Sequence, residues 1–235
     1  MEQIHVIVPA FNEGRHIEHV VTSIPAYVER IWVIDDGSQD DTWARLLGLQ
    51  ADQPRLRLLR HPHQMGVGAA LRTGYHAAFG LGADVVAVLA GDGQMDPQDL
   101  AAVLAPILAG NADYVKGNRL VHQQVRQTMP LSRWLGNQTL SRLTRLATGL
   151  HIDDSQCGYT ALSRAGATRL PLAQLWPSYG YPNDLLGWAA IRGLRVAEAP
   201  VRPIYGSEIS GVRLHHALLV VPGLLLRAAW RRTQP

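Results

Sequence analysis

The stretches Val6-Ile-Val-Pro-Ala-Phe-Asn-Glu-Gly14 and Trp32-Val-Ile-Asp-Asp-Gly-Ser-Gln-Asp-Asp-Thr42 decide the fold of this chain. In each, a run of β-branched apolar residues ends abruptly at polar and turn-forming residues, and a segment compatible with a helix follows. Two parallel strands would therefore deliver carboxylates to the same edge of a sheet. Open α/β sheets bind their ligands at that edge, beyond the carboxyl ends of the strands.

The alternation of strand-like and helix-like segments continues to about residue 119. We expect strands near residues 4–9, 30–34, 56–59, 84–89 and 113–116, and helices near residues 13–27, 42–50, 64–79 and 97–108. Repeated strand–helix units predict right-handed crossovers and a mostly parallel sheet with helices on both faces. The expected fold class is therefore α/β and Rossmann-like.

The second part of the chain has a different pattern. The segment 126–150 carries arginines among apolar residues at near-helical spacing, a further helix is expected up to Arg192, and a late strand is expected at 194–203. We expect one α/β domain over residues 1–210, followed by a tail over residues 211–235 that is first apolar and then basic.

The composition fits one globular domain with an anionic partner. The 235 residues are 47% hydrophobic, which is enough for a full core. The formal net charge is +3, too small and too scattered to indicate nucleic acid, and Lys116 is the only lysine among 22 basic residues. Arginine binds phosphate bidentately and keeps its charge, which favours an anionic small molecule or an anionic membrane surface.

Three features concern the compartment. The single cysteine, Cys157, excludes an internal disulfide and favours a reducing cytoplasm. The chain enters an expected strand almost at once, without the basic and apolar segments of a signal peptide. Its apolar runs are shorter than the ~20 residues of a membrane-spanning helix. We therefore expect a cytoplasmic protein, free or peripheral at the cytoplasmic face of the membrane.

Carboxylates gather at the expected carboxyl ends of separate strands. Asp35 and Asp36 follow one strand, and Asp92 follows another. Such groups repel one another unless a cation or a hydrogen-bonding ligand lies among them, and a nucleotide base, a ribose and a divalent metal supply those roles. The alternative is helix capping, which we favour for Asp40 and Asp41. For Asp36 and Asp92 we favour ligand contact.

Gly66, Gly68 and Gly74 punctuate the start of the third expected helix. A dinucleotide fingerprint belongs at the first strand–helix turn and needs an acidic residue about twenty positions later, so this location disfavours a dehydrogenase. Direct phosphate contact, or close helix–sheet packing with one tight turn, both explain the glycines.

Six sequence blocks occur in a fixed order: Val8-Pro-Ala-Phe-Asn-Glu13, Ile34-Asp-Asp-Gly-Ser38, Gly66-Val-Gly-Ala-Ala-Leu-Arg-Thr-Gly74, Gly91-Asp-Gly-Gln-Met-Asp-Pro97, Gly117-Asn-Arg119 and Asp154-Ser-Gln-Cys-Gly-Tyr159. With these blocks, residues 4 to about 210 resemble the family 2 glycosyltransferases of GT-A fold. The branch they resemble most includes dolichyl-phosphate mannose synthase and bacterial polyprenyl-phosphate glycosyltransferases. The resemblance implies a GT-A fold and an enzyme that uses a nucleotide-sugar donor.

The resemblance also implies roles for individual residues. It puts five residues around the base and ribose of the donor: Pro9, Phe11, Glu13, Ile34 and Asp36. It puts Gly91, Asp92 and Gln94 at the diphosphate, with Asp92 and Gln94 as ligands of Mg²⁺ or Mn²⁺. It makes Arg119 a contact to the sugar or the phosphates, Asp154 part of the acceptor side, and Asp184 a further acidic candidate.

Two departures from the family pattern weaken these expectations. Ala90-Gly-Asp92 stands where the family has Asp-x-Asp, which removes one carboxylate from the expected metal site. Mg²⁺ tolerates this, because it keeps several waters and leans on substrate phosphates. The segment 204–210 lacks the arginine and lysine that the family usually has there, and Arg202 or Arg213 are the candidates to replace them.

The expected function is transfer of a sugar from a GDP- or UDP-linked donor to a polyprenyl or dolichyl phosphate, with inversion. A phosphate acceptor needs no strong general base, whereas an alcohol acceptor would need one, and Asp154 or Asp184 would then be the candidates. The alternatives are transfer to a saccharide or soluble hydroxyl, and a non-catalytic protein that binds nucleotide sugars.

The apolar run 217–226 is too short to span a bilayer, and Pro222-Gly223 would interrupt a helix within it. Because Trp230 and three arginines follow, the tail could lie at a membrane interface. A helix that packs on the core explains the same residues, and we hold the two interpretations equal. The segment 126–145 poses the same choice, and there we favour guidance of a lipid phosphate.

Overall fold

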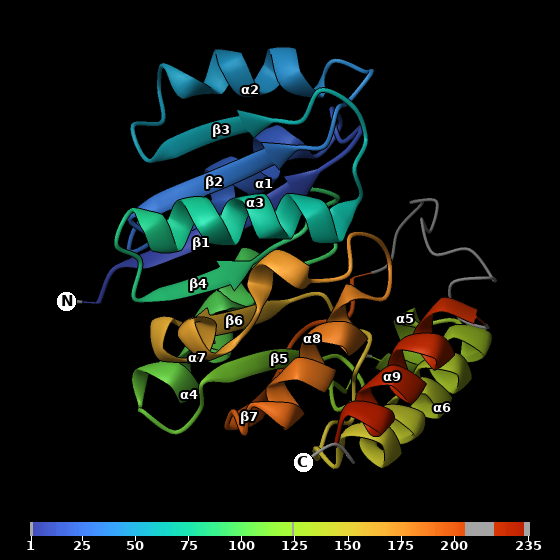
Figure 1. The fold of residues 1–235 in the computed structure, drawn as a ribbon. Helices are drawn as coiled ribbons and strands as arrows, with labels where there is room; N and C mark the ends of the chain where they lie inside the picture. Colours follow the sequence, from blue (N-terminus) through green and yellow to red (C-terminus); the bar gives the residue numbers. More distant parts are fainter. Residues whose placement is uncertain (1, 124, 205–218, 233–235) are drawn as a thin grey trace.

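The computed structural model describes residues 2–123, 125–204 and 219–232. Its centre is a seven-stranded sheet in the order β3-β2-β1-β4-β6-β5-β7 (Figure 1). The strands are β1 Ile4–Ala10, β2 Arg30–Asp35, β3 Leu56–Arg60, β4 Val85–Val88, β5 Tyr114–Asn118, β6 Thr160–Ser163 and β7 Val196–Pro200. All pairs are parallel except those of β6, which runs antiparallel to β4 and β5. The expected mostly parallel α/β sheet is confirmed.

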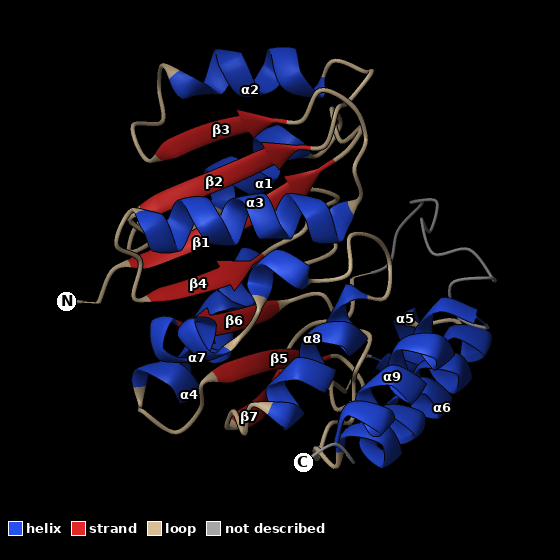
Figure 2. Cartoon of the chain, viewed as in Figure 1, coloured by secondary structure: helices blue, strands red, loops and turns tan. Residues whose placement is uncertain are grey.

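Helices cover both faces of the sheet (Figure 2). The helices are α1 Ile17–Ser23, α2 Thr42–Gln50, α3 Val67–Gly80, α4 Leu100–Leu108, α5 Val125–Thr128, α6 Leu131–Thr148, α7 Arg164–Arg169, α8 Tyr181–Ile191 and α9 Val221–Arg232, with short 3₁₀ turns at Pro97–Asp99 and Leu172–Gln174. One buried cluster joins α1, α2 and α4 to the sheet, and a second joins α3 and α8 to the opposite face.

Several element boundaries differ from the sequence-based expectation. The helix expected at 13–27 is confined to Ile17–Ser23, because Glu13 begins a turn whose carbonyl accepts the His16 and Ile17 N–H groups and because Pro25 cannot continue a helix. Strand β6 was not expected at all. It is four residues long, and its antiparallel pairing interrupts the strand–helix alternation on which the prediction relied.

The C-terminal helix α9 packs against α8 and α6. Its inner residues Val221, Leu224, Leu225 and Ala228 are buried, and Gly187 of α8 allows a close approach to Ala228. The expected interruption at Pro222-Gly223 is wrong: both residues lie within α9, directly after its first residue, Val221. Within the described residues, none of the helices has the length and apolar character needed to cross a membrane.

Candidate active site

The loops that follow β1 and β2 are tied together at the carboxyl edge of the sheet. The Asn12 N–H donates to the Ser38 hydroxyl at 2.9 Å, and the Gln39 N–H donates to the Asn12 side-chain carbonyl at 2.8 Å. The Glu13 N–H donates to the Thr42 hydroxyl at 2.8 Å. Asn12 adopts a left-handed backbone, with φ of 57°, which turns the chain sharply away from the strand. The two loops therefore form one rigid rim.

The residues expected around the nucleotide base lie along this rim. Pro9 is opposite Ile34 in the register of β1 and β2, and Phe11 and Glu13 follow half-buried beyond the strand. Ile34 is 0% exposed and packs in the core beneath α3, so its side chain is not open to a ligand in this structure. The contacts of Pro9, Phe11 and Glu13 with a donor stay predictions.

The two acids at the end of β2 have partners within the protein. Asp35 pairs with Arg60 at 2.9 Å and accepts the Ser38 N–H at 3.2 Å. Asp36 accepts the backbone N–H groups of Met65 at 2.9 Å and Gly66 at 2.7 Å, one on each oxygen. These bonds relieve the repulsion that the sequence analysis expected a ligand to relieve. A ligand contact by Asp36 stays a prediction. In this structure the Asp36 carboxylate holds the loop before α3.

His61 extends this anchor. Its Nδ1 lies 2.7 Å from Asp36 and its Nε2 lies 2.9 Å from the Thr73 hydroxyl, so the buried ring bridges the end of β2 and helix α3. The sequence alone does not single out His61, because a lone histidine after a strand belongs to no motif. Its place between a carboxylate and a hydroxyl fixes the orientation of Asp36.

The three glycines near α3 serve close packing. A Cβ on Gly66 would lie 2.5 Å from the Pro177 carbonyl oxygen, and one on Gly68 would lie 1.9 Å from the Trp176 carbonyl oxygen. A Cβ on Gly74 would lie 2.6 Å from a methyl carbon of Ile7 in β1. Of the two explanations from sequence, the structure therefore supports close approach of backbone to backbone and of helix to sheet.

The turn after β4 carries the expected metal ligands. Asp92 is half-buried, and its Oδ1 accepts the Gln94 N–H at 2.9 Å, which closes a tight turn. Gly91 lies against β1, where a Cβ would be 3.1 Å from the Pro9 carbonyl oxygen. Among the residues that the structure describes, no group of three or more His, Cys, Asp or Glu side chains forms a metal site. This donor set fits a hydrated Mg²⁺ or Mn²⁺ shared with substrate phosphates.

Glu13 and Asp92 follow neighbouring strands, β1 and β4, and both affect the pKa of Tyr179. Burial first, and then the negative charges of Asp92 and Glu13, raise the pKa of the Tyr179 phenol above its ordinary value. The Tyr179 phenol is therefore close enough to feel the negative charge of both carboxylates, Glu13 beyond β1 and Asp92 beyond β4. Tyr179 is not among the residues predicted from the sequence, because its neighbours in sequence form no motif that indicates this role.

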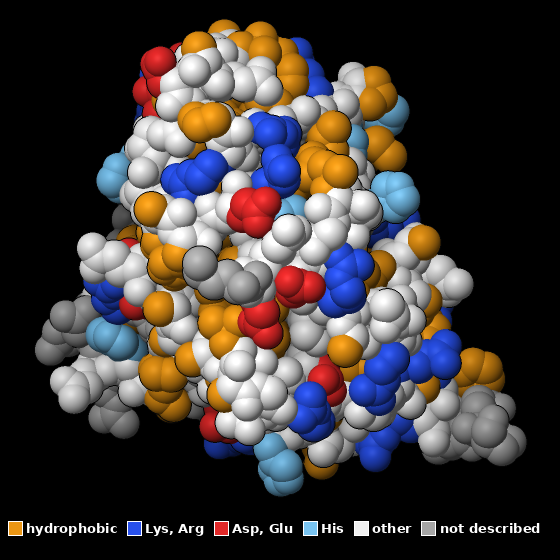
Figure 3. All heavy atoms as spheres, turned by 90° about the vertical axis from the view of Figure 1, so that its left-hand side faces the viewer, with side chains coloured by type: hydrophobic (Ala, Val, Ile, Leu, Met, Phe, Trp, Pro, Cys, Tyr) orange, Lys and Arg blue, Asp and Glu red, His pale blue; other side chains and the backbone are white. Residues whose placement is uncertain are grey.

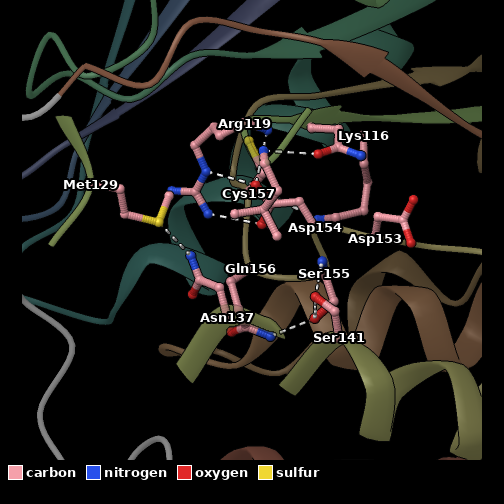
Figure 4. Close-up of polar contacts among 12 residues, drawn as sticks. Lys116, Arg119, Met129, Asn137, Ser141, Asp153, Asp154, Ser155, Gln156 and Cys157 are labelled. Atoms are coloured by element: carbon pink, nitrogen blue, oxygen red, sulfur yellow. Dashed lines mark hydrogen bonds and ion pairs between the residues drawn. The ribbon is translucent and has the colours of Figure 1, made fainter. Parts of the chain in front are cut away.

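Arg119 and Asp154 form the central ion pair of the site (Figure 4). The Arg119 Nε lies 2.8 Å from Asp154 Oδ2, its Nη2 lies 2.9 Å from Oδ1, and the Arg119 backbone N–H also donates to Oδ2 at 3.1 Å. Burial alone would raise the pKa of Asp154, but the charge and hydrogen bonds of Arg119 outweigh it and hold the pKa below its ordinary value. Asp154 is 0% exposed, so the geometry favours a positioning role over that of an open general base.

A second layer of polar residues supports this pair. Glu198 of β7 accepts the backbone N–H groups of Asp153 at 3.0 Å and Asp154 at 2.9 Å, and the Asn118 side-chain amide at 3.1 Å. Lys116 is 0% exposed and donates to the Cys157 carbonyl oxygen at 2.6 Å. Burial lowers the pKa of Lys116 and raises that of Glu198. These residues fix the backbone on which Arg119 and Asp154 stand.

Arg202, a candidate for the missing cation, has two acidic partners, and Arg119 pairs with the acid Asp154. Its guanidinium lies 2.9 Å from Asp96 and 3.0 Å from Asp99, and its backbone N–H donates to Asp99 at 2.7 Å. Arg202 therefore tethers the end of β7 to the segment after the Asp92 turn. Arg213, the other candidate, lies outside the described residues.

A small cavity of about 30 Å³ lies among the turn after β4, the residue that follows β5 and the segment beyond β7. Gln94 lines it from the turn after β4, Arg119 from the end of β5 and Arg202 from beyond β7. The structure thus brings Gln94 and Arg119 to one place, as expected. A cavity of this size holds no more than one or two waters, so it is too small to hold a sugar nucleotide.

Asp184 is placed differently. It lies in the first turn of α8, where its Oδ2 accepts the Trp176 N–H at 2.9 Å and its Oδ1 lies 3.9 Å from Arg231 of α9. Burial raises the pKa of this carboxyl above its ordinary value. Its observed contacts join α8 to α9, and a catalytic role for Asp184 stays a prediction.

Comparison with known proteins identifies this arrangement. The family profile described as "Glycosyl transferase family 2" matches residues 5–169, which is most of the chain and includes every block that carries Asp36, Asp92, Arg119 and Asp154. The chain belongs to glycosyl transferase family 2. It is therefore a glycosyltransferase, as the motifs implied.

Three relatives of this glycosyltransferase narrow the comparison. A UDP-N-acetylglucosamine–dolichyl-phosphate N-acetylglucosaminyltransferase of Methanococcus voltae is 31% identical over 86% of this chain and 86% of its own length. A polyprenol monophosphomannose synthase of Mycolicibacterium smegmatis is 30% identical over 92% of this chain and 84% of its own. An undecaprenyl-phosphate mannosyltransferase of Micrococcus luteus is 27% identical over 97% of this chain and 96% of its own.

A solved structure supports the fold. Glucosyl-3-phosphoglycerate synthase from Mycobacterium tuberculosis, in complex with Mn²⁺, UDP and glucosyl-3-phosphoglycerate, matches with a TM-score of 0.74 at 24% identity, over 97% of this chain and 80% of that protein. The expected GT-A fold of this family 2 glycosyltransferase is confirmed.

Proposed function

We propose that this glycosyltransferase moves a sugar from a GDP- or UDP-linked donor to a polyprenyl phosphate, with inversion at the anomeric carbon. Three relatives that cover most of the chain have dolichyl, polyprenol or undecaprenyl phosphate in their names or act as synthases of such monophosphate sugars. The site itself gives an independent reason for a phosphate acceptor.

That reason is the state of the two candidate bases. Asp154 accepts three hydrogen bonds from Arg119. Asp184 accepts a hydrogen bond from the Trp176 N–H and lies near the guanidinium of Arg231. An alcohol acceptor needs a carboxylate free to take its proton, whereas a phosphomonoester, whose second pKa is about 6, is already largely anionic at neutral pH. The occupied carboxylates therefore favour a phosphate acceptor over a hydroxyl.

In the proposed reaction an acceptor phosphate oxygen attacks the anomeric carbon. A new carbon–oxygen bond forms as the bond to the donor diphosphate breaks, and the nucleoside diphosphate leaves with the electron pair. The transition state resembles an oxocarbenium ion, so stabilising the departing negative charge supplies most of the catalysis. Arg119, held by Asp154 and lining the same cavity as Gln94, is the cation that we assign to the phosphates.

The donor side would be held by the rim of β1 and β2 and by the turn after β4. Phe11 and Glu13 would contact the base and ribose, and Asp92 with Gln94 would hold Mg²⁺ or Mn²⁺. When bound, such an ion neutralises diphosphate charge and needs only one or two protein carboxylates. Ala90, in place of a second acid, leaves the substrate phosphates to complete the coordination.

An acceptor comparison tests the proposal. The purified chain is incubated with UDP- and GDP-linked sugars, Mg²⁺ or Mn²⁺, and either a short-chain polyprenyl phosphate or the matching polyprenol. We expect glycosylated product with the phosphate and none with the alcohol. Equal transfer to the alcohol would reject the phosphate acceptor, and nucleotide binding without any sugar release would reject catalysis.

A further inference from the structure

Helix α6 has an inverted distribution of polar and apolar residues. Its buried residues are all polar: Asn137, Ser141, Thr144 and Thr148. Four of its five leucines face outward, with exposed fractions of 70% for Leu131, 52% for Leu135, 42% for Leu143 and 81% for Leu146, while Leu140 is half-buried. A surface helix of a globular protein normally buries its apolar stripe, so this orientation needs an explanation.

The inner face of α6 is fixed by hydrogen bonds rather than by apolar packing. Ser141 Oγ lies 3.2 Å from Ser155 Oγ and accepts the Ser155 N–H at 3.0 Å, and Thr144 Oγ1 lies 2.9 Å from the Asn183 side-chain carbonyl of α8. Rotating α6 to bury its leucines would break these bonds and leave buried polar groups unpaired, which is costly. The outward leucines are therefore built into the fold.

Helix α9 continues the same surface. Leu226 and Trp230, four positions apart on α9, are 73% and 62% exposed, and Leu219, just before the helix begins, is 71% exposed. α6 and α9 are in contact and lie side by side at the end of the molecule toward which the parallel strands point (Figure 1). We call the six exposed leucines and Trp230 on these two segments the α6–α9 surface.

The charge of these helices is of one sign. Together α6 and α9 contain six arginines, at positions 133, 142, 145, 227, 231 and 232, and no Asp or Glu. Basic and acidic side chains are instead intermingled at the opposite end, by the amino ends of the strands (Figure 3). Leucine and tryptophan among arginines is the composition of helices that lie in a membrane interface, where the apolar side chains enter the acyl boundary and the arginines meet anionic headgroups.

We propose that the α6–α9 surface lies on an anionic lipid bilayer, with both helix axes close to the membrane plane. A second copy of the chain is a poor occupant, because two such surfaces would bring twelve arginines together, and among the described residues the acids beside them, Asp153 at Arg145 and Asp184 at Arg231, are fewer than the arginines. The inference deepens the proposed function: Ser155, which holds α6, is the neighbour of Asp154, so the docked helix and the Arg119 site share one loop.

Vesicle flotation tests the proposal with the full chain. The wild type is mixed with vesicles of phosphatidylcholine alone or of phosphatidylcholine with phosphatidylglycerol. The test variant carries L135Q, L146Q and L226Q, and the control variant carries L47Q, L81Q and L108Q, three leucines that are similarly exposed elsewhere. We expect binding to the anionic vesicles only, weakened by salt, reduced at least about tenfold in the test variant and unchanged in the control.

Thermal unfolding and sedimentation accompany the flotation. Equal melting temperatures for the two variants show that the loss of binding is not a loss of fold. Absence of wild-type binding to anionic vesicles, equal loss in both variants, or a stable dimer that the test substitutions dissociate would each overturn the proposal.

A second assay separates this inference from the proposed reaction. Transfer to a short-chain polyprenyl phosphate in detergent-free solution is measured for wild type and test variant. Equal rates in solution, with loss of transfer only to long-chain acceptor in vesicles, support both statements. Vesicle binding without transfer to any polyprenyl phosphate would reject the proposed acceptor and support the membrane-binding role of the α6–α9 surface. Transfer without vesicle binding would support the proposed acceptor and reject the membrane-binding role.

Discussion

At the residue scale, the site depends on side chains whose partners lie far away in the sequence. Arg119 and Asp154 are 35 positions apart, and Asn118 and Glu198 are 80 positions apart. The motifs named Arg119 and Asp154 as separate candidates. The structure joins them into one unit, in which the buried carboxylate of Asp154 fixes the guanidinium of Arg119.

The Asp92→Asn substitution tests the metal side of the site. An amide cannot supply the negative charge that a divalent cation requires, so we expect sugar transfer to fall by about 10²–10³-fold, the cost of losing one electrostatic contact in the transition state. Initial rates are measured over a range of Mg²⁺ and Mn²⁺ concentrations. Asp52→Asn, at an exposed position away from the site, is the control. Unchanged turnover in Asp92→Asn would remove Asp92 from the metal site.

The Asp154→Asn substitution tests the ion pair through pH. The folded-state pKa of Asp154 is depressed, so its stabilisation is fully present above the ordinary Asp pKa of about 3.9 and is lost as pH falls toward the lower folded value. We expect the Asp154→Asn substitution to lower the free energy of unfolding by about 2–3 kcal/mol at neutral pH. This loss is smaller than the loss on breaking a fully buried ion pair, because Arg119 keeps some access to water.

The measurement for Asp154→Asn is urea unfolding at a series of pH values. The difference in unfolding free energy between wild type and variant should become smaller as the solution becomes more acidic. A difference that stays constant down to the lowest pH would mean that the charge of Asp154 contributes nothing to the stability of the ion pair.

At the element scale, helix α3 shows how a glycine sets the distance between layers. Gly74 lies where a Cβ would be 2.6 Å from Ile7 of β1, so the helix rests directly on the strand. The sequence predicted α3 well, because its apolar period is clear and its glycines mark the start. It could not decide between packing and phosphate contact, since both need a missing side chain.

The Gly74→Ala substitution should destabilise the protein by about 1–3 kcal/mol, the usual cost of overpacking a close contact. Gly48→Ala in α2 is the matched control, since a Cβ there meets nothing within 4 Å and alanine favours a helix interior. Denaturant unfolding of both variants checks the difference. Equal stability of the two would show that α3 can move away from β1 at no cost.

At the scale of the whole molecule, donor binding should raise the melting temperature. A ligand that binds only the native state stabilises it by an amount that grows with concentration, about 2.7 kcal/mol at a hundred times the dissociation constant. We expect one nucleotide class, UDP- or GDP-linked, to give the larger shift, and only with Mg²⁺ or Mn²⁺ present. Thermal scans with each nucleotide sugar, with metal and with chelator, provide the measurement.

The outcome of these scans bears on the site directly. An equal rise in melting temperature with chelator present would argue that donor binding does not need a metal ion held by Asp92 and Gln94. Shifts that are identical for UDP- and GDP-linked donors would argue against base recognition by the rim of Phe11 and Glu13.

The sequence by itself determined the α/β sheet, the family and the acids at the strand ends, because local apolar periodicity and short motifs carry that information within a few residues. Only the tertiary structure decided which side chains are open. In the folded protein Ile34 is buried in the core, and Asp154 and Arg202 form ion pairs with other side chains. Strand β6 lies antiparallel between β4 and β5. The tertiary structure also turned four of the five leucines of α6 outward, since burial is decided by what packs against a helix and the sequence of one helix does not contain its neighbours.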